Sequence, residues 1–163
     1  RGDREVVLVA VAKDGCALSY ASKELQGDRE VVLVAVAQDG RALQHASKHM
    51  QRDREVVLAA VAEHGFAQHW ASRELQGDRE VVLAAVAQHG VSLADASTVL
   101  KGDREVVLAA VAKSAGALRY ASRELQETGS SCLLKPKLSD LWVRSGLVPK
   151  LHAETLRQIC NSL

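Results

Sequence analysis

The sequence predicts an all-α fold, an α-solenoid of five 25-residue helix-turn-helix repeats with a C-terminal helical tail. The hexapeptide Asp-Arg-Glu-Val-Val-Leu occurs near the start of every copy and recurs every 25 residues, from Asp3 to Asp103. An Ala-Ser pair recurs at the same spacing, from Ala21 to Ala121. Each copy has room for two short helices, which cannot bury their apolar faces alone, and a stacked array supplies the neighbours that they need.

The copies follow one another without insertion, and a different kind of sequence begins after Gln126. The segment Glu127-Thr-Gly-Ser-Ser is small and polar, which is typical of a loop. Pro149 is suited to the first turn of a last helix. The predicted organisation is therefore five repeats (2–26, 27–51, 52–76, 77–101 and 102–126), a linker at 127–139, and a C-terminal helical cap or extension at 140–163.

The first helix of a copy has a clear start and a clear end. Asp3 is a good N-cap, because its carboxylate can accept hydrogen bonds from the free amides of the first turn. Glu5 lies in the same turn, where the helix dipole favours a negative charge. The run Val6–Ala12 is apolar on every side, which predicts burial on most of the helix surface. Gly15 is expected to end the helix as a C′ residue with positive φ.

The second helix is predicted from about Ala17 to Leu25. Leu18, Ala21, Ser22 and Leu25 are spaced i, i+3, i+4 and i+7, which places them on one inward-facing stripe. Ser22 is expected to be a small packing residue. In the third copy, Gln68 takes the place of the inward leucine.

Composition excludes several classes of function. The 163 residues are 47% hydrophobic and 25% charged with a net charge of +1, a balance typical of a globular protein. The five repeats hold 15 Lys and Arg against 17 Asp and Glu, a net charge of −2 that disfavours binding to nucleic acid. The longest apolar run is too short to cross a membrane.

The cysteines and the first residue add two expectations. The three cysteines are far apart and form no C-x-x-C pair, which argues against a disulfide framework or a zinc site and favours a reducing, intracellular (cytoplasmic) location. Because the chain opens at Arg1 inside a repeat, without Met, we expect it to be a fragment of a longer protein.

The positions that vary between copies predict a binding surface. In the first copy they are Cys16, Ser19, Tyr20 and Lys23, whose spacing places them on one helix face opposite the inward stripe. A fixed core with a variable outer face is how solenoids present a binding surface, although an exposed face can also simply drift after duplication. Aromatic residues and arginine are enriched at the energetic centres of protein interfaces. The candidate binding residues are therefore Arg41, His45, Phe66, His69, Trp70, Arg73, Tyr20 and Tyr120.

The sequence contains no convincing catalytic or metal-binding constellation. Asp-Arg-Glu recurs five times, so it is interpreted as a helix cap with a surface ion pair. His45 and His49 are spaced i, i+4, but no third ligand stands near them in the sequence. Ser22 and its copies lack the His-Asp arrangement that would activate a serine. We therefore expect no enzyme activity, no cofactor and no metal.

The units Glu-Val-Val-Leu-Ala-Ala-Val, Gly, Ala-Leu and Tyr-Ala-Ser resemble the short helical repeats of the domain-of-unknown-function family DUF4116, over residues 2–126. The resemblance implies a helical repeat protein from an alga or another protist, and it implies no activity. The expected function is a protein-interaction scaffold with an unidentified protein partner, acting away from membranes, as a monomer or with weak self-association. The alternatives are a nucleic-acid-binding helical repeat and a purely structural array within a longer protein.

Overall fold

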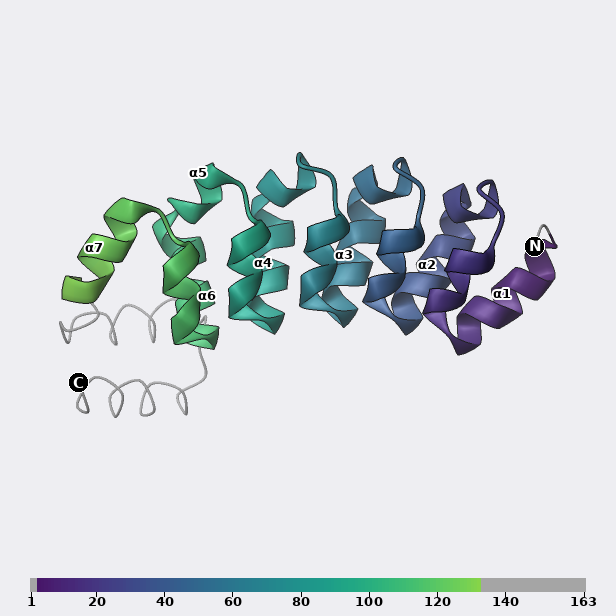
Figure 1. The fold of residues 1–163 in the computed structure, drawn as a ribbon, viewed down its shortest axis with the longest axis horizontal. Helices are drawn as coiled ribbons and strands as arrows, with labels where there is room; N and C mark the ends of the chain where they lie inside the picture. Colours follow the sequence, from purple (N-terminus) through teal and green to yellow (C-terminus); the bar gives the residue numbers. More distant parts are fainter. Residues whose placement is uncertain (1–2, 133–163) are drawn as a thin grey trace.

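The computed structural model describes residues 3–132, which form a row of stacked helical repeats (Figure 1). The first four repeats each consist of an α-helix, a 3-10 helix and one further helical turn. The elements are α1 (Arg4–Lys13), η1 (Gly15–Tyr20), η2 (Leu25–Gly27), α2 (Arg29–Gln38), η3 (Gly40–His45), η4 (Met50–Arg52), α3 (Arg54–Glu63), η5 (Gly65–Trp70), η6 (Leu75–Gly77), α4 (Arg79–Gln88), η7 (Gly90–Asp95), α5 (Thr98–Lys101), α6 (Arg104–Lys113), η8 (Ala115–Tyr120) and α7 (Arg123–Cys132).

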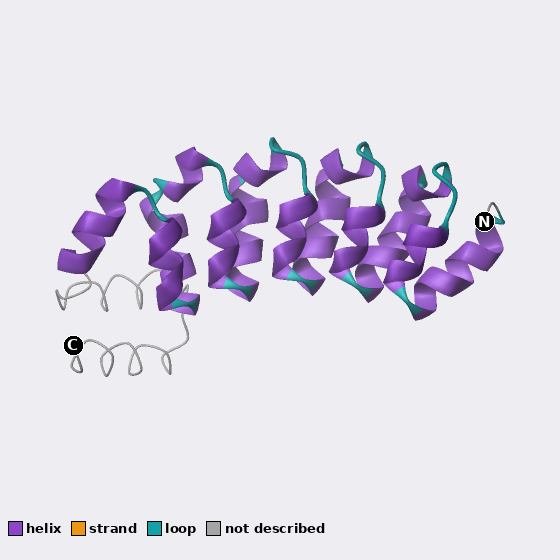
Figure 2. Ribbon diagram, viewed as in Figure 1, coloured by secondary structure: helices purple, strands orange, loops and turns teal. Residues whose placement is uncertain are grey.

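The repeats stack in two layers. The helices α1, α2, α3, α4 and α6 pack side by side in one layer, and the 3-10 helices η1, η3, η5, η7 and η8 form the other. Helix α2 contacts the 3-10 helix of its own repeat and that of the preceding repeat, and α3, α4 and α6 do the same. Within the described residues every element is a helix or a loop (Figure 2), so the predicted all-α solenoid is confirmed.

Aspartate starts each long helix, as predicted. In the second repeat Asp28 Oδ1 accepts hydrogen bonds from the amides of Glu30 at 3.0 Å and Val31 at 3.1 Å. The hydrogen bond from Val31, together with the guanidinium of Arg4, lowers the pKa of the Asp28 carboxyl below its usual value. A charged N-cap of this kind stabilises a helix of about ten residues that would be marginal in water.

The Arg of the same motif joins one repeat to the next. Arg4 Nε lies 3.2 Å from Asp28 Oδ2, and the Arg4 guanidinium also pairs with Glu30. Each exposed pair contributes little to stability, and the pairs recur with the same partners along the row of repeats. The predicted cap and surface ion pair are therefore both present, and the ion pair runs between repeats. The other members are Arg29 with Asp53 and Glu55, Arg54 with Asp78 and Glu80, and Arg79 with Asp103 and Glu105.

The predicted continuous second helix is wrong. The 3-10 helix η1 ends at Tyr20, and Ala21 has extended backbone angles, φ −69° and ψ 160°. Ser22 then turns the chain, and its Oγ accepts a hydrogen bond from the amide of Leu25 at 3.4 Å. Ser22 therefore caps the following turn and does not serve as a small packing residue within a helix.

Hydrogen bonds from the glutamine and serine positions of the repeat hold this break in place. The side chain of Gln26 reaches back across the loop and donates to the carbonyl oxygens of Leu18 and Ala21 at 3.3 and 3.4 Å. In the next repeat the backbone amide of Ser47 donates to the Gln26 carbonyl at 2.9 Å, and the serines of the third to fifth repeats bond backwards in the same way. In the second to fifth repeats a tertiary hydrogen bond therefore replaces the helical one at the Ala-Ser pair.

The prediction for Gly15 is also wrong. Helix α1 ends at Lys13, and Gly15 begins η1 without a left-handed φ. The glycine is needed because the next repeat approaches too closely for a side chain. A Cβ added at this position would lie far inside contact distance of a carbonyl oxygen: Gly15 from Ala35 at 2.3 Å, Gly40 from Ala60 at 2.2 Å, Gly65 from Ala85 at 2.8 Å and Gly90 from Ala110 at 2.3 Å.

The loop predicted after Gln126 begins as a helix. Helix α7 extends to Cys132, so the part of the predicted linker at 127–132 is helical. An i,i+4 contact between Arg123 Nε and Glu127 Oε1 at 3.1 Å spans this point, and no Asp cap follows here to start another repeat helix. The rest of the linker and the predicted cap or extension at 140–163 lie outside the described residues.

Gln68 occupies a core position, as the sequence predicts. Its side chain is fully buried at the place where Leu43 and Leu93 lie in the flanking repeats. Neither Oε1 nor Nε2 has a hydrogen-bond partner among the described residues. A buried amide without partners loses its hydration and gains nothing in return, so this side chain destabilises the third repeat.

Replacing Gln68 by leucine is therefore expected to raise the free energy of unfolding by about 1–3 kcal/mol, since leucine has a similar volume and no polar atom to satisfy. Chemical denaturation followed by circular dichroism measures the change. Gln76→Leu is the matched control. The Gln76 amide donates to the carbonyl oxygens of Gln68, His69 and Ala71, so its loss should lower stability. Destabilisation by both substitutions would contradict this account of Gln68.

Candidate functional site

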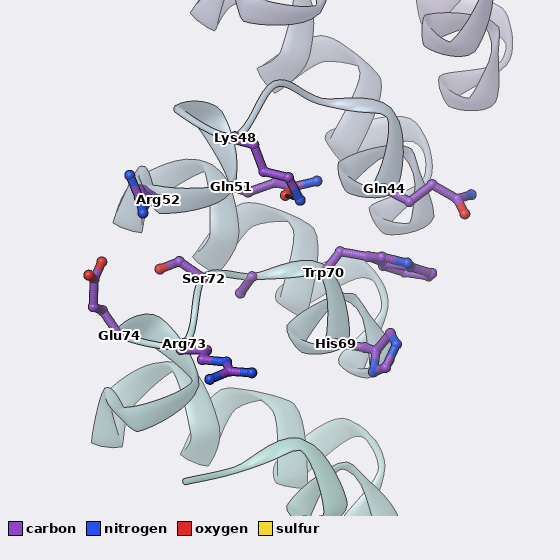
Figure 3. A pocket seen from close by; sticks show the side chains of 10 residues that line it. Gln44, Lys48, Gln51, Arg52, His69, Trp70, Ser72, Arg73 and Glu74 are labelled. Atoms are coloured by element: carbon purple, nitrogen blue, oxygen red, sulfur yellow. Dashed lines mark hydrogen bonds between the residues drawn. The ribbon is translucent and has the colours of Figure 1, made fainter.

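An open groove of about 770 Å³ lies between the second and third repeats (Figure 3). One side comes from the end of η5 and the loop that follows it, and the other side comes from η3, η4 and the loop between them. The residues that line it are Gln44, Lys48, Gln51, Arg52, His69, Trp70, Ala71, Ser72, Arg73 and Glu74.

The break after η5 creates this groove. The spacing of the variable positions predicted that they share one helix face. Because the chain turns away at Ala71, the positions before and after the turn do not share one. His69 and Trp70 project from the last turn of η5, whereas Arg73 belongs to the loop. The same break in the second repeat brings Lys48 to the opposite wall. The groove therefore joins variable positions of two consecutive repeats.

Trp70 provides the apolar part of the groove. Its ring lies between Gln44 and His69 in Figure 3, and it meets the His69 ring edge-on with centroids 6.1 Å apart. Trp70 also packs against the core of the array, so it is partly exposed and partly buried. Its predicted role as the anchor for a partner stays a prediction.

Positive charge dominates the walls. Lys48, Arg52 and Arg73 are exposed cations, against one exposed carboxylate, Glu74. Lys48 Nζ donates to Gln51 Oε1 at 3.2 Å, a neutral acceptor that leaves its charge uncompensated. Neither Arg52 nor Arg73 forms an ion pair with another residue of the described part of the chain. The groove therefore offers cationic donors beside one aromatic ring.

His69 is tied to the next repeat. Its Nδ1 lies 2.9 Å from Asp95 Oδ1 at the end of η7. This contact orients the imidazole at the edge of the groove. The fourth repeat therefore positions a groove residue, although it lines no part of the groove itself.

Phe66 separates from the other predicted site residues of its repeat. It does not line the groove and instead stacks on His89 of the following repeat, with ring centroids 4.8 Å apart, close to His64 as well. Phe66 is 38% exposed. Of the predicted cluster, His69, Trp70 and Arg73 therefore line the groove, whereas Phe66, at the beginning of η5, lies outside it.

Arg41 and His45 also lie outside the groove. The Arg41 guanidinium hydrogen-bonds both carboxylate oxygens of Asp39, with a shortest distance of 2.7 Å, and lowers the pKa of that carboxyl to about 2. Arg41 is therefore engaged within its own repeat, where it supports the start of η3. His45 ends η3 and is partly buried.

The two tyrosines lie at the ends of the array. Tyr20 ends η1 and is 74% exposed. Tyr120 ends η8, is partly buried and has the Arg119 guanidinium over its ring at 5.0 Å. Both hold the repeat position of Trp70, but neither lines the groove beside Trp70.

Some groove residues were not among the predicted site residues. Gln44 and Lys48 occupy variable positions of the second repeat, and their role depends on the apposition of two repeats. Arg52 could have been identified from the sequence as a variable position, because the other copies have glycine there. Across the described residues no cluster of three or more potential metal ligands is present, and none of the helices combines the length and the apolar character of a membrane span.

The stacked repeats and the groove between them define a helical repeat protein with variable surface positions. A family model described as "Domain of unknown function (DUF4116)" matches residues 3–51, 53–101 and 78–126. The chain belongs to this family, in agreement with the resemblance seen in the sequence. No curated protein and no solved structure matched the chain.

Proposed function

We propose that this repeat array is a scaffold that holds a protein partner, with the groove beside Trp70 as the centre of the contact. The observation that carries the proposal is the groove itself, which unites a partly exposed tryptophan with exposed cations from two repeats. Tryptophan and arginine are the residue types that most often carry binding energy at protein interfaces. The proposal assigns the array a binding role and no catalytic one.

The division between fixed and variable positions supports this reading. The fixed positions build the scaffold: Asp28 caps a helix, Gly40 permits close stacking, and Ser47 bonds to the preceding repeat. The groove residues Gln44 and Trp70 belong to positions that differ between copies. A scaffold that is constant inside and variable at a surface groove can change its ligand without losing its fold.

The charges favour a partner segment that carries carboxylates. Lys48, Arg52 and Arg73 outnumber Glu74, and the arginines can bind a carboxylate through two parallel hydrogen bonds. The Trp70 ring offers apolar area to a neighbouring aliphatic or aromatic side chain. We therefore propose an extended acidic segment with at least one large apolar residue as the ligand.

Trp70→Ala is expected to weaken binding of such a segment by about 2 kcal/mol, or roughly 30-fold, if Trp70 is the anchor. Selection from a library of random short peptides supplies the ligand, and fluorescence anisotropy of the selected peptide measures affinity. Acidic sequences should be enriched. Because Trp70 also contacts the core, the circular dichroism spectrum of the variant is recorded to verify folding.

Two further variants separate the groove from other surfaces. Arg73→Glu changes an exposed side chain and should weaken binding about tenfold without affecting the fold. Tyr20→Ala removes an aromatic residue outside the groove and should leave affinity unchanged. Loss of binding in Tyr20→Ala, with Trp70→Ala unaffected, would move the binding surface to the first repeat. Selection of neutral or basic peptides would reject the acidic ligand.

The two alternative functions predict different experimental results. A nucleic-acid-binding repeat would retain a labelled single-stranded RNA with strong salt dependence, through cations along the strand. A purely structural array would select no peptide whose binding depends on Trp70. The fourth repeat carries Ala94 and the acidic Asp95 at the positions of His69 and Trp70. This disfavours a nucleic-acid-binding mode in which each repeat contacts one base.

A further inference from the structure

The junction between the third and fourth repeats has polar residues in its core. At every junction a leucine position of one 3-10 helix is followed by an alanine position of the next 3-10 helix, as with Leu43 and Ala67 between the second and third repeats. Both of these residues are fully buried and belong to one apolar cluster. Between the third and fourth repeats the same two positions hold Gln68 and Ser92, which are fully buried as well.

Burial along the described array shows which way the two positions face. The leucine position is fully buried at Leu93, but it is partly exposed at Leu118, which no further repeat follows among the described residues. The alanine position is fully buried at Ala117, but it is partly exposed at Ala17, in the first repeat described. The leucine position therefore faces the following repeat and the alanine position faces the preceding one. It follows that the glutamine and the serine face the same junction from opposite sides.

The polar atoms at this junction lack partners. Neither Oε1 nor Nε2 of Gln68, nor Oγ of Ser92, has a hydrogen-bond partner among the described residues. The other buried side-chain atom of this kind in the described structure is Nδ1 of His64, whose ring lies 5.8 Å from the ring of His89 across the same junction. All of the unsatisfied buried side-chain atoms of the described residues are thus found at one of the four junctions.

The backbones of the two repeats also approach each other differently here. A Cβ added to Gly65 would lie 2.8 Å from both the Ala85 carbonyl oxygen and Gln88 Cβ, whereas the distance to the corresponding carbonyl oxygen is 2.2 or 2.3 Å at the other three junctions. Across the junction Gln88 Nε2 donates to the Ala62 carbonyl oxygen at 3.1 Å, in an exposed position. Exposed contacts of this kind surround a core whose polar groups are unsatisfied.

Separation of two repeats has a different free-energy cost at this junction. At the other junctions it would transfer apolar side chains such as Leu43 and Ala67 into water, which is unfavourable. Between the third and fourth repeats it would hydrate the Gln68 amide and the Ser92 hydroxyl, which then gain the hydrogen bonds that they lack in the closed array. We propose that the array opens reversibly at this junction and behaves as two units, the first three repeats and the last two.

This opening acts on the groove from outside. Both sides of the groove belong to the second and third repeats, so it stays within one unit. Asp95, whose Oδ1 lies 2.9 Å from His69 Nδ1, belongs to the other unit. Opening of the junction therefore releases the imidazole at the edge of the groove. The inference rests on the core of the junction and does not depend on the ligand proposed for the groove.

Each junction contains one equivalent backbone amide that reports its opening. The amides of Ser47, Ser72, Ser97 and Ser122 each donate to a carbonyl oxygen of the preceding repeat. Because alanine precedes the serine in every copy, the four amides have matching exchange rates when unprotected. Hydrogen exchange of the complete chain, followed residue by residue with NMR under native conditions, should show that Ser97 exchanges at least about tenfold faster than the other three.

A double variant identifies the cause. Gln68→Leu combined with Ser92→Ala restores the apolar pair of the other junctions, so exchange of the Ser97 amide should slow to about the rate of Ser72, whose own rate should stay unchanged. A Ser97 amide as slow as that of Ser72 in the natural chain would overturn the proposal. Faster exchange of Ser122 than of Ser97 would also overturn it, because the fifth repeat would then be detaching by itself. Equal slowing of all four amides in the double variant would show a global gain in stability in place of a local opening.

Discussion

Replacing Val56 by aspartate is expected to lower the free energy of unfolding by at least about 3 kcal/mol, because the carboxylate would enter a fully buried site without a partner. Val56 lies in α3, at the junction between the second and third repeats. Repeats contact mainly their neighbours, so the loss should unfold the array locally around this junction. Urea denaturation followed by circular dichroism should show an earlier transition with part of the helical signal.

The chain contains a matched control for this substitution. Val6 holds the same repeat position, but it is 65% exposed because no repeat precedes it in the described structure. Val6→Asp should change stability by no more than about 0.5 kcal/mol. If both substitutions lowered the free energy of unfolding by similar amounts, the valine would stabilise its own helix and not the contact between repeats. The account of burial between repeats would then fail.

Gly40→Ala is expected to destabilise the array by about 3 kcal/mol, near the upper end for an overpacked core. The added methyl group would lie 2.2 Å from the Ala60 carbonyl oxygen and 2.9 Å from His64 Cβ. No flexible side chain can move aside to relieve these contacts, so the repeats must separate. Thermal and chemical denaturation both measure this loss.

Gly116→Ala is the control for the glycine prediction. Gly116 also lies in a 3-10 helix, but an added Cβ would meet only Ser114 Oγ, at 3.8 Å. Alanine there should be neutral or stabilise the protein by up to about 1 kcal/mol, since it restricts the unfolded chain. If Gly40→Ala were as mild as Gly116→Ala, close stacking would not be the reason for glycine at the junctions.

The sequence was sufficient to predict the fold class and the start of each long helix. The 25-residue spacing set the repeat, and Asp28 and its copies acted as caps because capping depends on local geometry alone. The break at Ala21 could not be predicted in this way. A spacing of i, i+3, i+4 and i+7 fits one continuous helix, and in the second to fifth repeats the amide of the serine after the break donates to a carbonyl oxygen of the preceding repeat.

The error at Gly15 has a similar cause. A glycine that ends a helix with positive φ and a glycine that permits close approach look alike in a sequence. Only the position of the Ala35 carbonyl, 20 residues further along the chain, distinguishes them. The ion pair between Arg4 and Asp28 is likewise a product of stacking, although both residues were recognised as charged surface positions.

The candidate site was predictable in part. His69, Trp70 and Arg73 were identified from their variability and residue type, and they line one groove together. Phe66 was grouped with them because of its helical spacing, but it does not line the groove and stacks on His89 of the following repeat. Arg52 was missed although the other copies have glycine at its position, whereas the roles of Gln44 and Lys48 required knowledge of which repeat surfaces meet.

Hydrogen–deuterium exchange of the chain with and without a selected acidic peptide is the most direct test of the central claim, that the array holds a partner in the groove beside Trp70. The account predicts slower exchange of backbone amides at 44–52 and 69–74, the two walls of the groove, and unchanged exchange in the first and fifth repeats. Protection confined to the region around Tyr20 or Tyr120, with none at the groove walls, would contradict it.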